Sequence, residues 1–384
     1  MLELTEKQQE AYDKIVDWFA CGQHLITMGG YAGTGKTTLV GMLAREFKTQ
    51  NKRIAFCTVA GKASTVLRSK LDDVLTDVDY CGTIHGLIYM LIDKEKTRSG
   101  RMELIFEKDT KRKMPYDLIV IDEASMVSES MFRDLSSYGI PILAVGDHGQ
   151  LPPVKSQFNL MENPQIRLET IMRQEENSPI IIMCSLARTR GAVPYGDYGQ
   201  GCLKTQDTKV LHSHPFSSPD AIMICALNKT RVRYNNFARE KLGIISPYPV
   251  VGEPVICLYN NRRKMIFNGN IGILKSIEVV FRNEIDENKI ELLDVEIDMG
   301  DFIYRGTIDP SQFGKEYVSV DEKDDDLDYF DWAYCITCHK AQGSEFKQVL
   351  VIEEGEFMFK NDLWNKWLYT ALSRAKERLI IYKR

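Results

Sequence analysis

Short runs of aliphatic and β-branched residues recur along the chain, and stretches with helical spacing of apolar residues separate them. Runs that read as strands occupy residues 24–30, 53–59, 117–124, 141–147, 221–228, 332–338, 348–354 and 378–384. Continuous apolar strands that alternate with helices are typical of parallel sheets covered on both faces. Because the runs fall into two sets of four, the pattern predicts an α/β protein with two parallel-sheet domains.

Two segments depart from this rhythm. Within residues 81–114, two strand-like runs flank a polar Lys-Thr-Arg-Ser-Gly-Arg turn, which predicts a β-hairpin insert. Residues 251–330 carry short strands and turns, which predict a small β module. The remaining segments form the two larger domains, the first from 1–80 with 115–165 and the second from 166–250 with 331–384.

Composition is that of an ordinary globular protein, with 44% hydrophobic and 27% charged residues. The net charge of −5 argues mildly against nucleic acid as a partner, although a local basic groove stays compatible with it. No apolar run approaches the roughly 18 residues that a membrane helix needs, and the charged N-terminus resembles no export signal. We therefore expect a cytoplasmic protein without a membrane partner.

Residues 30–37, Gly-Tyr-Ala-Gly-Thr-Gly-Lys-Thr, follow a predicted strand and precede an amphipathic run. The spacing G-x-x-x-x-G-K-[ST] is that of a phosphate-binding loop, whose backbone amides point at phosphate oxygens. Lys36 would neutralise the β and γ phosphates, Thr37 would offer its hydroxyl to Mg²⁺, and the following helix would favour the anion. The predicted nucleotide-binding residues are Gly30, Gly33, Thr34, Gly35, Lys36, Thr37 and Thr38.

Two further strands end in polar residues that suit hydrolysis. Asp122 is expected to hold Mg²⁺, and Glu123 to orient and deprotonate the attacking water. A hydrolase needs such an acid, whereas a kinase does not. Gln150, in the segment Gly-Asp-His-Gly-Gln-Leu-Pro-Pro, could sense a γ phosphate or position water, and a polar turn is the alternative for this segment.

In chain order, these segments resemble the motif set of superfamily 1 helicases, most closely the RecD/Dda-type 1B branch. The phosphate loop, Ile-Asp-Glu-Ala-Ser-Met and Gly-Asp-His-Gly-Gln-Leu-Pro-Pro-Val resemble motifs I, II and III. The segments that resemble the Q motif and motifs Ib, IV, V and VI are LTEKQQEAY, CGTIHG, LETIMRQ, ITCHKAQGSEF and YTALSRAKERL. The ordered set runs from residue 4 to residue 379 and is far more specific than any one member.

The resemblance implies two RecA-like domains with ATP and Mg²⁺ in the cleft between them, a hairpin insert in the first and a small SH3-like β-barrel in the second. It assigns the adenine to Gln8 and the ribose to Glu345, beside Gly343. It assigns transition-state charge to Arg173 and Arg374. Both arginines lie far from the phosphate loop in the chain, so they reach the γ phosphate only when the domains close, and this couples hydrolysis to motion.

The resemblance also implies single-stranded DNA and fork junctions as partners, 5′→3′ translocation, and a hairpin pin that separates the duplex, with Phe106 as its wedge. Candidate strand contacts, of types that suit the DNA backbone, are Thr58, Lys62, Thr83, His85, Asn228, Thr337, His339 and Lys340. Helix capping is the alternative for Thr83 and His85, and inward packing for Phe106. We expect a monomer with replication or recombination proteins as partners, in a host cytoplasm if phage-encoded.

Three alternatives remain. One is an ATP-gated strand-binding module or translocase without strong unwinding, and another is a small-molecule P-loop kinase. The third concerns the nine cysteines, whose odd number predicts reduced thiols. Cys335-Ile-Thr-Cys338-His339 matches a haem-attachment pattern, and zinc would need a second ligand pair such as His212 and His214. Buried apolar cysteines fit this segment better than either cofactor.

Overall fold

The first parallel sheet is built from buried strands in the N-terminal half. The computed structural model describes residues 4–59, 61–96, 102–109, 113–152, 158–171, 177–261, 263–283, 289–300, 302–317, 327–354 and 361–383. The strands are β1 (Leu25–Gly30), β2 (Ile54–Thr58), β3 (Tyr80–Thr83), β6 (Leu118–Ile121), β7 (Ile142–Gly146) and β8 (Ile166–Leu168). They pair in parallel in the order β3-β2-β6-β7-β1-β8.

Helices cover both faces of this sheet, which explains why its strands are apolar along their whole length. The helices are α1 (Glu6–Ala20), α2 (Lys36–Thr49), α3 (Gly61–Lys70), α4 (Ile84–Ile88) and α5 (Glu129–Ser136), with a 3-10 turn η1 (Ala124–Met126). Residues of α1, α2 and α3 share one hydrophobic cluster with the strands, and residues of α4 and α5 share another.

The second sheet repeats this plan in the C-terminal half. Its strands are β9 (Gly196–Gly199), β10 (Cys202–Thr205), β11 (Ala221–Cys225), β18 (Cys335–Thr337), β19 (Phe346–Ile352) and β20 (Ala375–Tyr382). The order is β18-β11-β19-β20-β10-β9, and β9 is the single antiparallel edge of this sheet as described. Its helices are α6 (Pro179–Arg190), α7 (Lys209–His212), α8 (Asn228–Lys241), α9 (Cys338–Ala341) and α10 (Asn361–Leu372).

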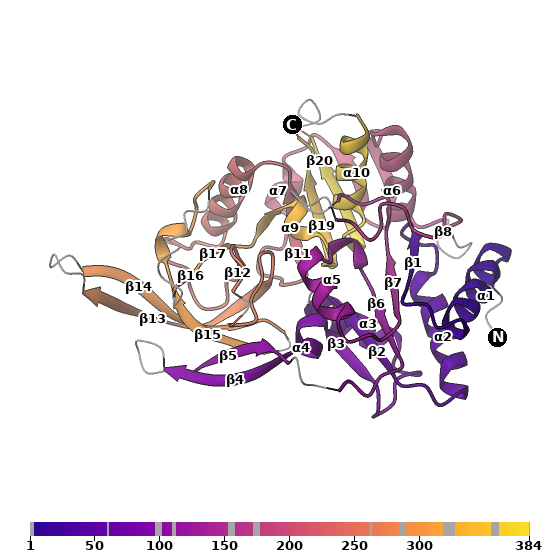
Figure 1. The fold of residues 1–384 in the computed structure, drawn as a ribbon. Coiled ribbons are helices and arrows are strands. Elements are labelled where there is room, and N and C mark those ends of the chain that lie inside the picture. The colour runs from indigo at the N-terminus through magenta and orange to yellow at the C-terminus, as the bar shows by residue number, and fades with distance from the viewer. Residues whose placement is uncertain are drawn as a thin grey trace.

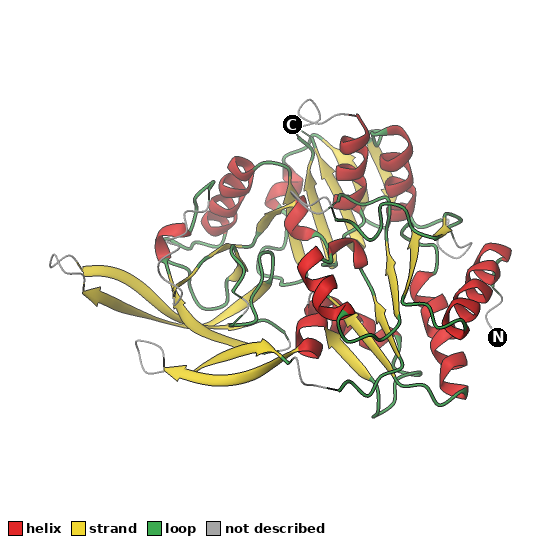
Figure 2. Ribbon diagram, viewed as in Figure 1, coloured by secondary structure: helices red, strands yellow, loops and turns green. Residues whose placement is uncertain are grey.

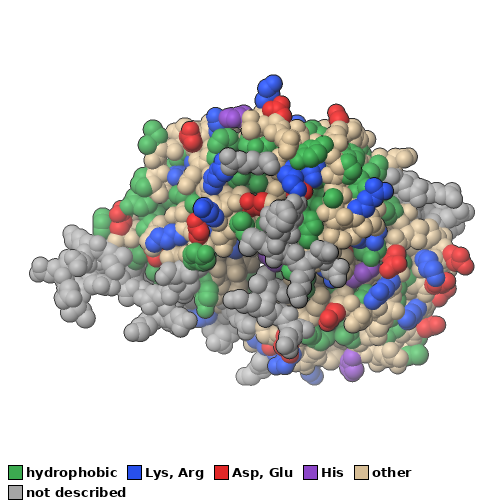
Figure 3. Space-filling view, turned by 90° about the horizontal axis from the view of Figure 1, so that it is seen from above, with side chains coloured by type: hydrophobic (Ala, Val, Ile, Leu, Met, Phe, Trp, Pro, Cys, Tyr) green, Lys and Arg blue, Asp and Glu red, His purple; other side chains and the backbone are tan. Residues whose placement is uncertain are grey.

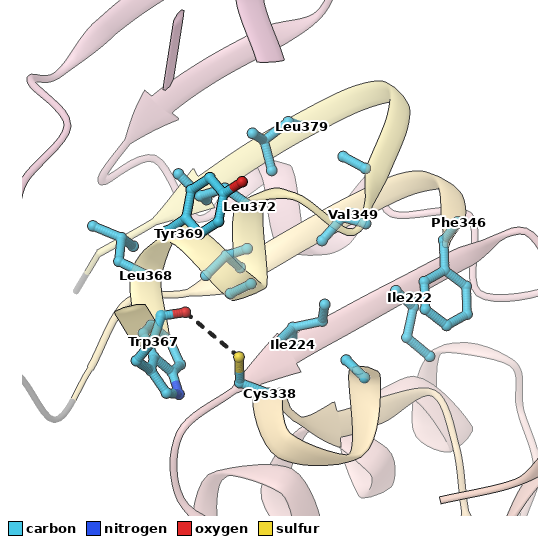
Figure 4. Packing of buried hydrophobic residues seen from close by; sticks show 14 of the residues in the cluster. Ile222, Ile224, Cys338, Phe346, Val349, Trp367, Leu368, Tyr369, Leu372 and Leu379 are labelled. Atoms are coloured by element: carbon cyan, nitrogen blue, oxygen red, sulfur yellow. Dashed lines mark hydrogen bonds between the residues drawn. The ribbon is translucent and has the colours of Figure 1, made fainter. Parts of the chain in front are cut away.

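Helices α6, α9 and α10 cover one face of this sheet, and α7 and α8 the other. Figure 4 shows Trp367, Leu368 and Leu372 of α10 packed toward the strands. The thiol of Cys338 lies 3.5 Å from the Trp367 carbonyl in this layer. Within the described residues, no helix has both the length and the apolar character needed to cross a bilayer.

A third sheet and a two-stranded hairpin complete the fold. The hairpin pairs β4 (Tyr89–Lys96) with β5 (Met102–Lys108). The third sheet has the order β16-β15-β14-β13-β12-β17 and contains β12 (Pro254–Cys257), β13 (Ile271–Asn283), β14 (Lys289–Asp298), β15 (Ile303–Ile308), β16 (Leu327–Asp328) and β17 (Phe330–Trp332), with a 3-10 turn η2 (Pro310–Gln312). Only Tyr329 separates β16 from β17, although they lie at opposite edges, so the sheet curls into a nearly closed barrel.

The hairpin and the long β13–β14 ribbon extend away from the two parallel sheets on the same side of the molecule (Figures 1 and 2). Strand β5 of the hairpin contacts β15 of the third sheet. The inserts predicted for each domain are therefore neighbours in space.

The predicted fold, two parallel-sheet domains with a hairpin and a small β module, is confirmed. Three short strands lie across the predicted boundaries. Strand β3 pairs with β2 rather than belonging to the hairpin segment, β8 pairs with β1 of the first sheet, and β17 pairs with β12 of the third. Strands of three or four residues carry little pattern of their own, so pairing partners decide their sheet.

Buried ion pairs join the third sheet to helix α8. Arg231 pairs with Asp331, and the side chains of both are at most 4% exposed. Arg239 donates to Glu253 at 2.8 Å, and its guanidinium lies 4.1 Å from the ring centre of Trp332. A buried charge is tolerated only with a partner, so these pairs fix where the barrel sits on the second domain.

We expect Asp331→Ala to lower the free energy of unfolding by about 3–5 kcal/mol, because it leaves the buried Arg231 guanidinium without its carboxylate. Urea unfolding followed by tryptophan fluorescence measures this loss. The control is Glu129→Ala, which breaks an exposed pair with Arg133 and should change stability by less than about 1 kcal/mol. Equal effects of the two substitutions would contradict the structural role of the buried pair.

Candidate nucleotide site and nucleic-acid interface

The phosphate loop connects β1 to α2, and its glycines meet specific geometric demands. Gly33 and Gly35 have φ angles of +77° and +76°, a left-handed conformation that favours glycine. At position 30 glycine is needed for lack of space, because an added Cβ would lie 2.7 Å from Oγ1 of Thr34. The loop thus makes the tight turn before α2 that a phosphate-binding loop requires.

Lys36 lies over this loop and donates to the carbonyls of Gly30 and Tyr31, at 2.7 and 2.9 Å. Thr37 is half-buried, whereas Thr38 is exposed. The charge of Lys36 opposes the rise in pKa that burial causes at the Asp122 carboxyl. The predicted phosphate ligands are therefore brought together with the predicted acids.

Gln8 ties helix α1 to the phosphate loop. Its Oε1 accepts from the Thr5 amide at 3.0 Å, in a capping box that starts α1, and its Nε2 donates to the Thr34 carbonyl at 3.1 Å. The side chain is buried. The structure gives Gln8 a role in holding the loop, and its contact with adenine stays a prediction.

Asp122 and Glu123 end β6 and face the cleft. Glu123 has a φ angle of +55°, unusual for a residue with a side chain, and its amide donates to Oδ1 of Asp122 at 3.0 Å. Burial raises the pKa of both carboxyls, and the positive charges of Lys36 and Arg374 oppose that rise for Glu123. Oε2 of Glu123 is buried and lacks a hydrogen-bond partner among the described residues, so it can accept a proton or a hydrogen bond from a ligand.

Arg374 belongs to the second domain and lies close to Glu123 of the first. It is 2% exposed and follows α10. Its guanidinium donates to the Thr370 carbonyl at 3.1 Å and to the Ser373 hydroxyl at 3.0 Å. Arg374 is therefore a buried cation held in a fixed orientation at the cleft.

Tyr369 joins the two domains at the phosphate loop, and the sequence interpretation missed it. Its hydroxyl donates to the Asp147 carboxylate and accepts from the Ala32 amide at 2.8 Å. The other Asp147 oxygen accepts from the Gly149 amide at 2.8 Å. An added Cβ on Gly149 would approach the rings of Tyr31 and Tyr369 to 2.8 and 3.1 Å, so the glycine permits this close approach.

The segment that contains Gln150 is held by the second domain on both sides. The Leu151 amide donates to the Thr370 hydroxyl at 2.8 Å, and the Leu151 carbonyl accepts from Gln342 at 2.6 Å. The Leu151 side chain lies in the hydrophobic cluster of the second domain. Gln150 is 5% exposed, and its Oε1 has no hydrogen-bond partner in the described part of the chain.

Glu345 and Gly343 close the cleft from the second domain. Burial would raise the pKa of Glu345, but Lys376, with Nζ 2.7 Å from Oε2, holds that pKa below its usual value together with other nearby cations. An added Cβ on Gly343 would collide with Sδ of Met126 in the first domain. A cavity of about 30 Å³ lies between Asp122, Glu123 and these residues, enough for one or two waters.

The structure gives two predicted strand contacts surroundings within the protein, and their contact with DNA stays a prediction. Thr58 is fully buried at the end of β2, so its side chain is covered by the protein. The Thr83 hydroxyl accepts from the Gly86 amide at 3.0 Å and caps α4, which is the alternative role considered for it. His85 is 4% exposed and stacks on Phe267 of the loop between β12 and β13, with ring centres 3.6 Å apart.

Four other predicted contacts gather at the carboxyl ends of β11 and β18. Asn228 is exposed at the start of α8, and Thr337 is half-buried at the start of α9. His339 and Lys340 follow on α9, and burial lowers the pKa of both, that of Lys340 to about 8. This cluster can donate hydrogen bonds to a polar ligand.

Some predicted features cannot be placed or take another form. Arg173 lies outside the described residues, as do the side chains of Lys62 and Phe106. Cys335 and Cys338 are buried free thiols, and burial lowers the pKa of His214 to about 4. Within the described ranges, no cluster of three or more His, Cys, Asp and Glu residues could hold a metal ion. For Mg²⁺, the hydroxyl of Thr37 and the carboxylate of Asp122 are the oxygen ligands that it prefers.

Solved structures of Pif1 helicases share this fold. Structures of Pif1 helicases on forked double-stranded DNA match with a TM-score of 0.53, at 20% identity over 99% of this chain and 92% of theirs. The Pif1 helicase from Bacteroides in complex with ADP-AlF3 and ssDNA matches with a TM-score of 0.51, at the same identity and coverage. At this identity the likeness establishes the fold alone.

Sequence comparison places the chain in a family. The ATP-dependent RecD2 DNA helicase of Deinococcus radiodurans is 25% identical over 402 residues, which cover 98% of this chain and 48% of that protein. The chain thus spans about half the length of this curated relative. A UvrD-like helicase C-terminal domain matches residues 332–382, and an AAA domain matches residues 3–207. Since the AAA domain alone covers more than half of the sequence, the chain belongs to that family, and its motifs, relatives and fold are those of superfamily 1B helicases of the RecD and Pif1 type.

Proposed function

We propose that this chain is an ATP-dependent DNA helicase that hydrolyses ATP between its two parallel-sheet domains. The observation that carries the proposal is that Arg374, a buried arginine of the second domain, lies close enough to Glu123 of the first for its charge to oppose the rise in pKa that burial causes at that carboxyl. Neither domain holds a complete hydrolytic site. Turnover then depends on how the domains are placed, which a motor requires and a simple nucleotide-binding module does not.

Each residue has a distinct task in this scheme. Lys36 and the loop amides bind the phosphates, Thr37 and Asp122 would hold Mg²⁺, which neutralises phosphate charge when bound, and Glu123 accepts the proton of the attacking water. Arg374 stabilises the charge that develops on the γ phosphate. Arg173 is proposed to assist it, and Gln150 to position the water. Glu345 would hold the ribose.

Closure of the domains is proposed to be transmitted through the segment that contains Gln150. Tyr369, Thr370 and Gln342 of the second domain hold this segment beside the phosphate loop. A change at the γ phosphate can therefore alter contacts of the second domain without a long relay. The buried pairs on α8 carry such a movement into the third sheet.

Single-stranded DNA and fork junctions are the proposed substrates, with 5′→3′ translocation. Support comes from the Bacteroides Pif1 complex with ssDNA, from the Pif1 structures on forked DNA, and from the cluster of Asn228, Thr337, His339 and Lys340. Basic and acidic side chains are interspersed on the face seen in Figure 3, so we expect specific grooves rather than one broad basic surface to bind the strand. The hairpin beside the third sheet is proposed as the wedge, with Phe106 at the fork.

One experiment separates this function from its alternatives. ATP hydrolysis is measured with and without single-stranded DNA, and strand displacement with tailed duplexes. Stimulation by DNA together with displacement supports a helicase. Stimulation alone would indicate a translocase without strong unwinding. Conversion of ATP to ADP that needs a small-molecule acceptor, with the phosphoryl group transferred to that acceptor, would indicate a kinase.

Glu123→Gln should reduce ATP turnover by about 100-fold or more while nucleotide binding persists, because the amide keeps the shape of the side chain and cannot accept the proton. Steady-state hydrolysis and binding of a fluorescent nucleotide measure the two effects. Glu129→Gln, on the exposed side of α5, is the control and should leave both unchanged. Parallel loss of binding and turnover would instead assign Glu123 a structural role.

Tyr369→Phe should lower kcat for ATP by about 10- to 100-fold, with a smaller change in KM, because it leaves the buried Asp147 carboxylate without its donor from the second domain. Steady-state kinetics at saturating single-stranded DNA tests this. Tyr317→Phe removes a hydroxyl from a tyrosine that is 78% exposed and should have no effect. An unchanged kcat in Tyr369→Phe would show that this bridge does not couple the domains.

A duplex with a 5′ single-stranded tail should be unwound, whereas the same duplex with a 3′ tail should not. The expectation follows from the 1B resemblance, since the strand would cross the two domains in one fixed direction. Displacement of a labelled strand measures it, and a blunt duplex is the control. A preference for the 3′ tail would reverse the proposed polarity.

A further inference from the structure

Three aromatic rings form a stack between the first domain and the third sheet. Phe267 lies on His85 with ring centres 3.6 Å apart and planes inclined by 23°. His85 in turn lies 5.4 Å from the ring centre of Tyr89, with planes inclined by 22°. His85 and Tyr89 belong to the segment of α4 and β4, whereas Phe267 is on the loop before β13. The stack ends at Phe267, which is half-buried.

The loop that carries Phe267 is firmly held. The Phe267 amide donates to Oδ1 of Asn270 at 2.8 Å, and the Asn270 amide donates back to the Phe267 carbonyl at 2.8 Å. Gly269 has a φ angle of +97°, and its amide donates to the Cys257 carbonyl of β12 at 2.9 Å. The ring is therefore fixed before any ligand arrives, which lowers the entropic cost of binding.

A cavity of about 760 Å³ adjoins this stack, and both His85 and Phe267 line it. Its walls come from three parts of the molecule: β3 and α3 of the first domain, the third sheet, and the start of β19 in the second domain. Apolar side chains dominate the lining, among them Val59, Met265, Ile271, Met299, Phe302 and Phe346. Such a volume is typical of sites for small organic groups.

The few charged residues around the cavity indicate which part of a nucleotide, the phosphate or the base, could bind there. Among the described lining residues, Arg68 and Asp298 carry the formal charges, and Arg68 already donates to the Cys81 carbonyl. A phosphate would meet mainly apolar surface and an acid there, which is unfavourable. A nucleobase has apolar faces and polar edges, and it suits a ring platform with a few polar groups. The Asn270 side-chain amide beside the ring can serve a base edge.

We propose that this cavity is a nucleobase pocket, in which one base of the bound strand stacks on Phe267. The inference rests on the proposed function, because it requires that the DNA strand pass the residues of β3 and α3 that line the cavity. Phe267 is then a substrate-contacting residue, and His85 and Tyr89 are positioning residues that support its ring from behind. The pocket lies where three parts of the molecule meet, so domain closure changes its walls and can hold or release the base at each step.

The test compares Phe267→Ala with wild type on two single strands of about 12 nucleotides. One is a thymidine strand, and the other has the same backbone with every base removed. Wild type should lose affinity for the strand without bases. In Phe267→Ala, affinity for the thymidine strand should fall about tenfold, as expected for one lost stack, while affinity for the abasic strand stays nearly constant. Fluorescence anisotropy measures all four affinities.

Two variants guard against a folding defect. Phe267→Leu keeps the apolar volume but not the flat face and should resemble Phe267→Ala, whereas Phe267→Tyr should restore wild-type binding. Phe281→Ala removes an exposed ring from β13 outside the cavity lining and is the matched control. Three results would overturn the base pocket. They are an equal loss of affinity for both strands in Phe267→Ala, no loss of affinity in that variant, or wild-type affinity of Phe267→Leu for the thymidine strand. If wild type bound neither strand, the proposed helicase function itself would fail.

Discussion

A single buried hydroxyl connects the nucleotide site to the second domain. The Tyr369 hydroxyl donates a hydrogen bond to Asp147 and accepts one from the Ala32 amide, so one side chain of α10 contacts both the phosphate loop and the segment before Gln150. If the domains separated at this point, both partners would lose the Tyr369 hydroxyl and would need water in its place. Thr370 and Gln342 of the second domain form two further hydrogen bonds with Leu151, which hold the same segment against the second domain. These contacts hold the two domains together at the cleft, where the charge of Arg374 acts on the Glu123 carboxyl.

Buried charged side chains occur at both places where the second domain meets another part of the molecule, the nucleotide cleft and the barrel. At the cleft, the carboxyls of Asp122 and Glu123 lie in an environment that disfavours their charge, and cations from both domains compensate. At the barrel, the Arg231–Asp331 and Arg239–Glu253 pairs fix the third sheet to α8. The barrel thus moves with the second domain, while the His85–Phe267 stack is a contact across which it meets the first. The two kinds of interface differ in strength, since a ring stack separates at a lower cost than a buried ion pair.

Lys340 illustrates how the proposed strand site depends on its surroundings. Burial lowers the pKa of its ammonium to about 8, and Arg231 acts in the same direction. A phosphate placed beside it would favour the charged form, so strand binding and protonation of Lys340 would strengthen one another. The same helix α9 begins directly after β18, which places these side chains at the carboxyl edge of the second sheet. Parallel strands thereby direct the predicted contacts to one edge, as they do for the phosphate loop in the first domain.

The sequence by itself determined the two parallel sheets, the phosphate loop, the acids after β6 and the family, because apolar strands and motif spacings are local patterns. It also identified Arg374, through its motif. Only the tertiary structure decided which side chains meet. Tyr369, Gln342 and Phe267 act through partners more than 100 residues away in the chain, and no local pattern encodes such a contact. Thr58 and Thr83 show the converse, since their residue types predict a strand contact, whereas only the structure shows that Thr58 is buried at the end of β2 and that Thr83 caps α4. Strands as short as β8 likewise carry no signal of their own, and pairing energy alone places them in a sheet.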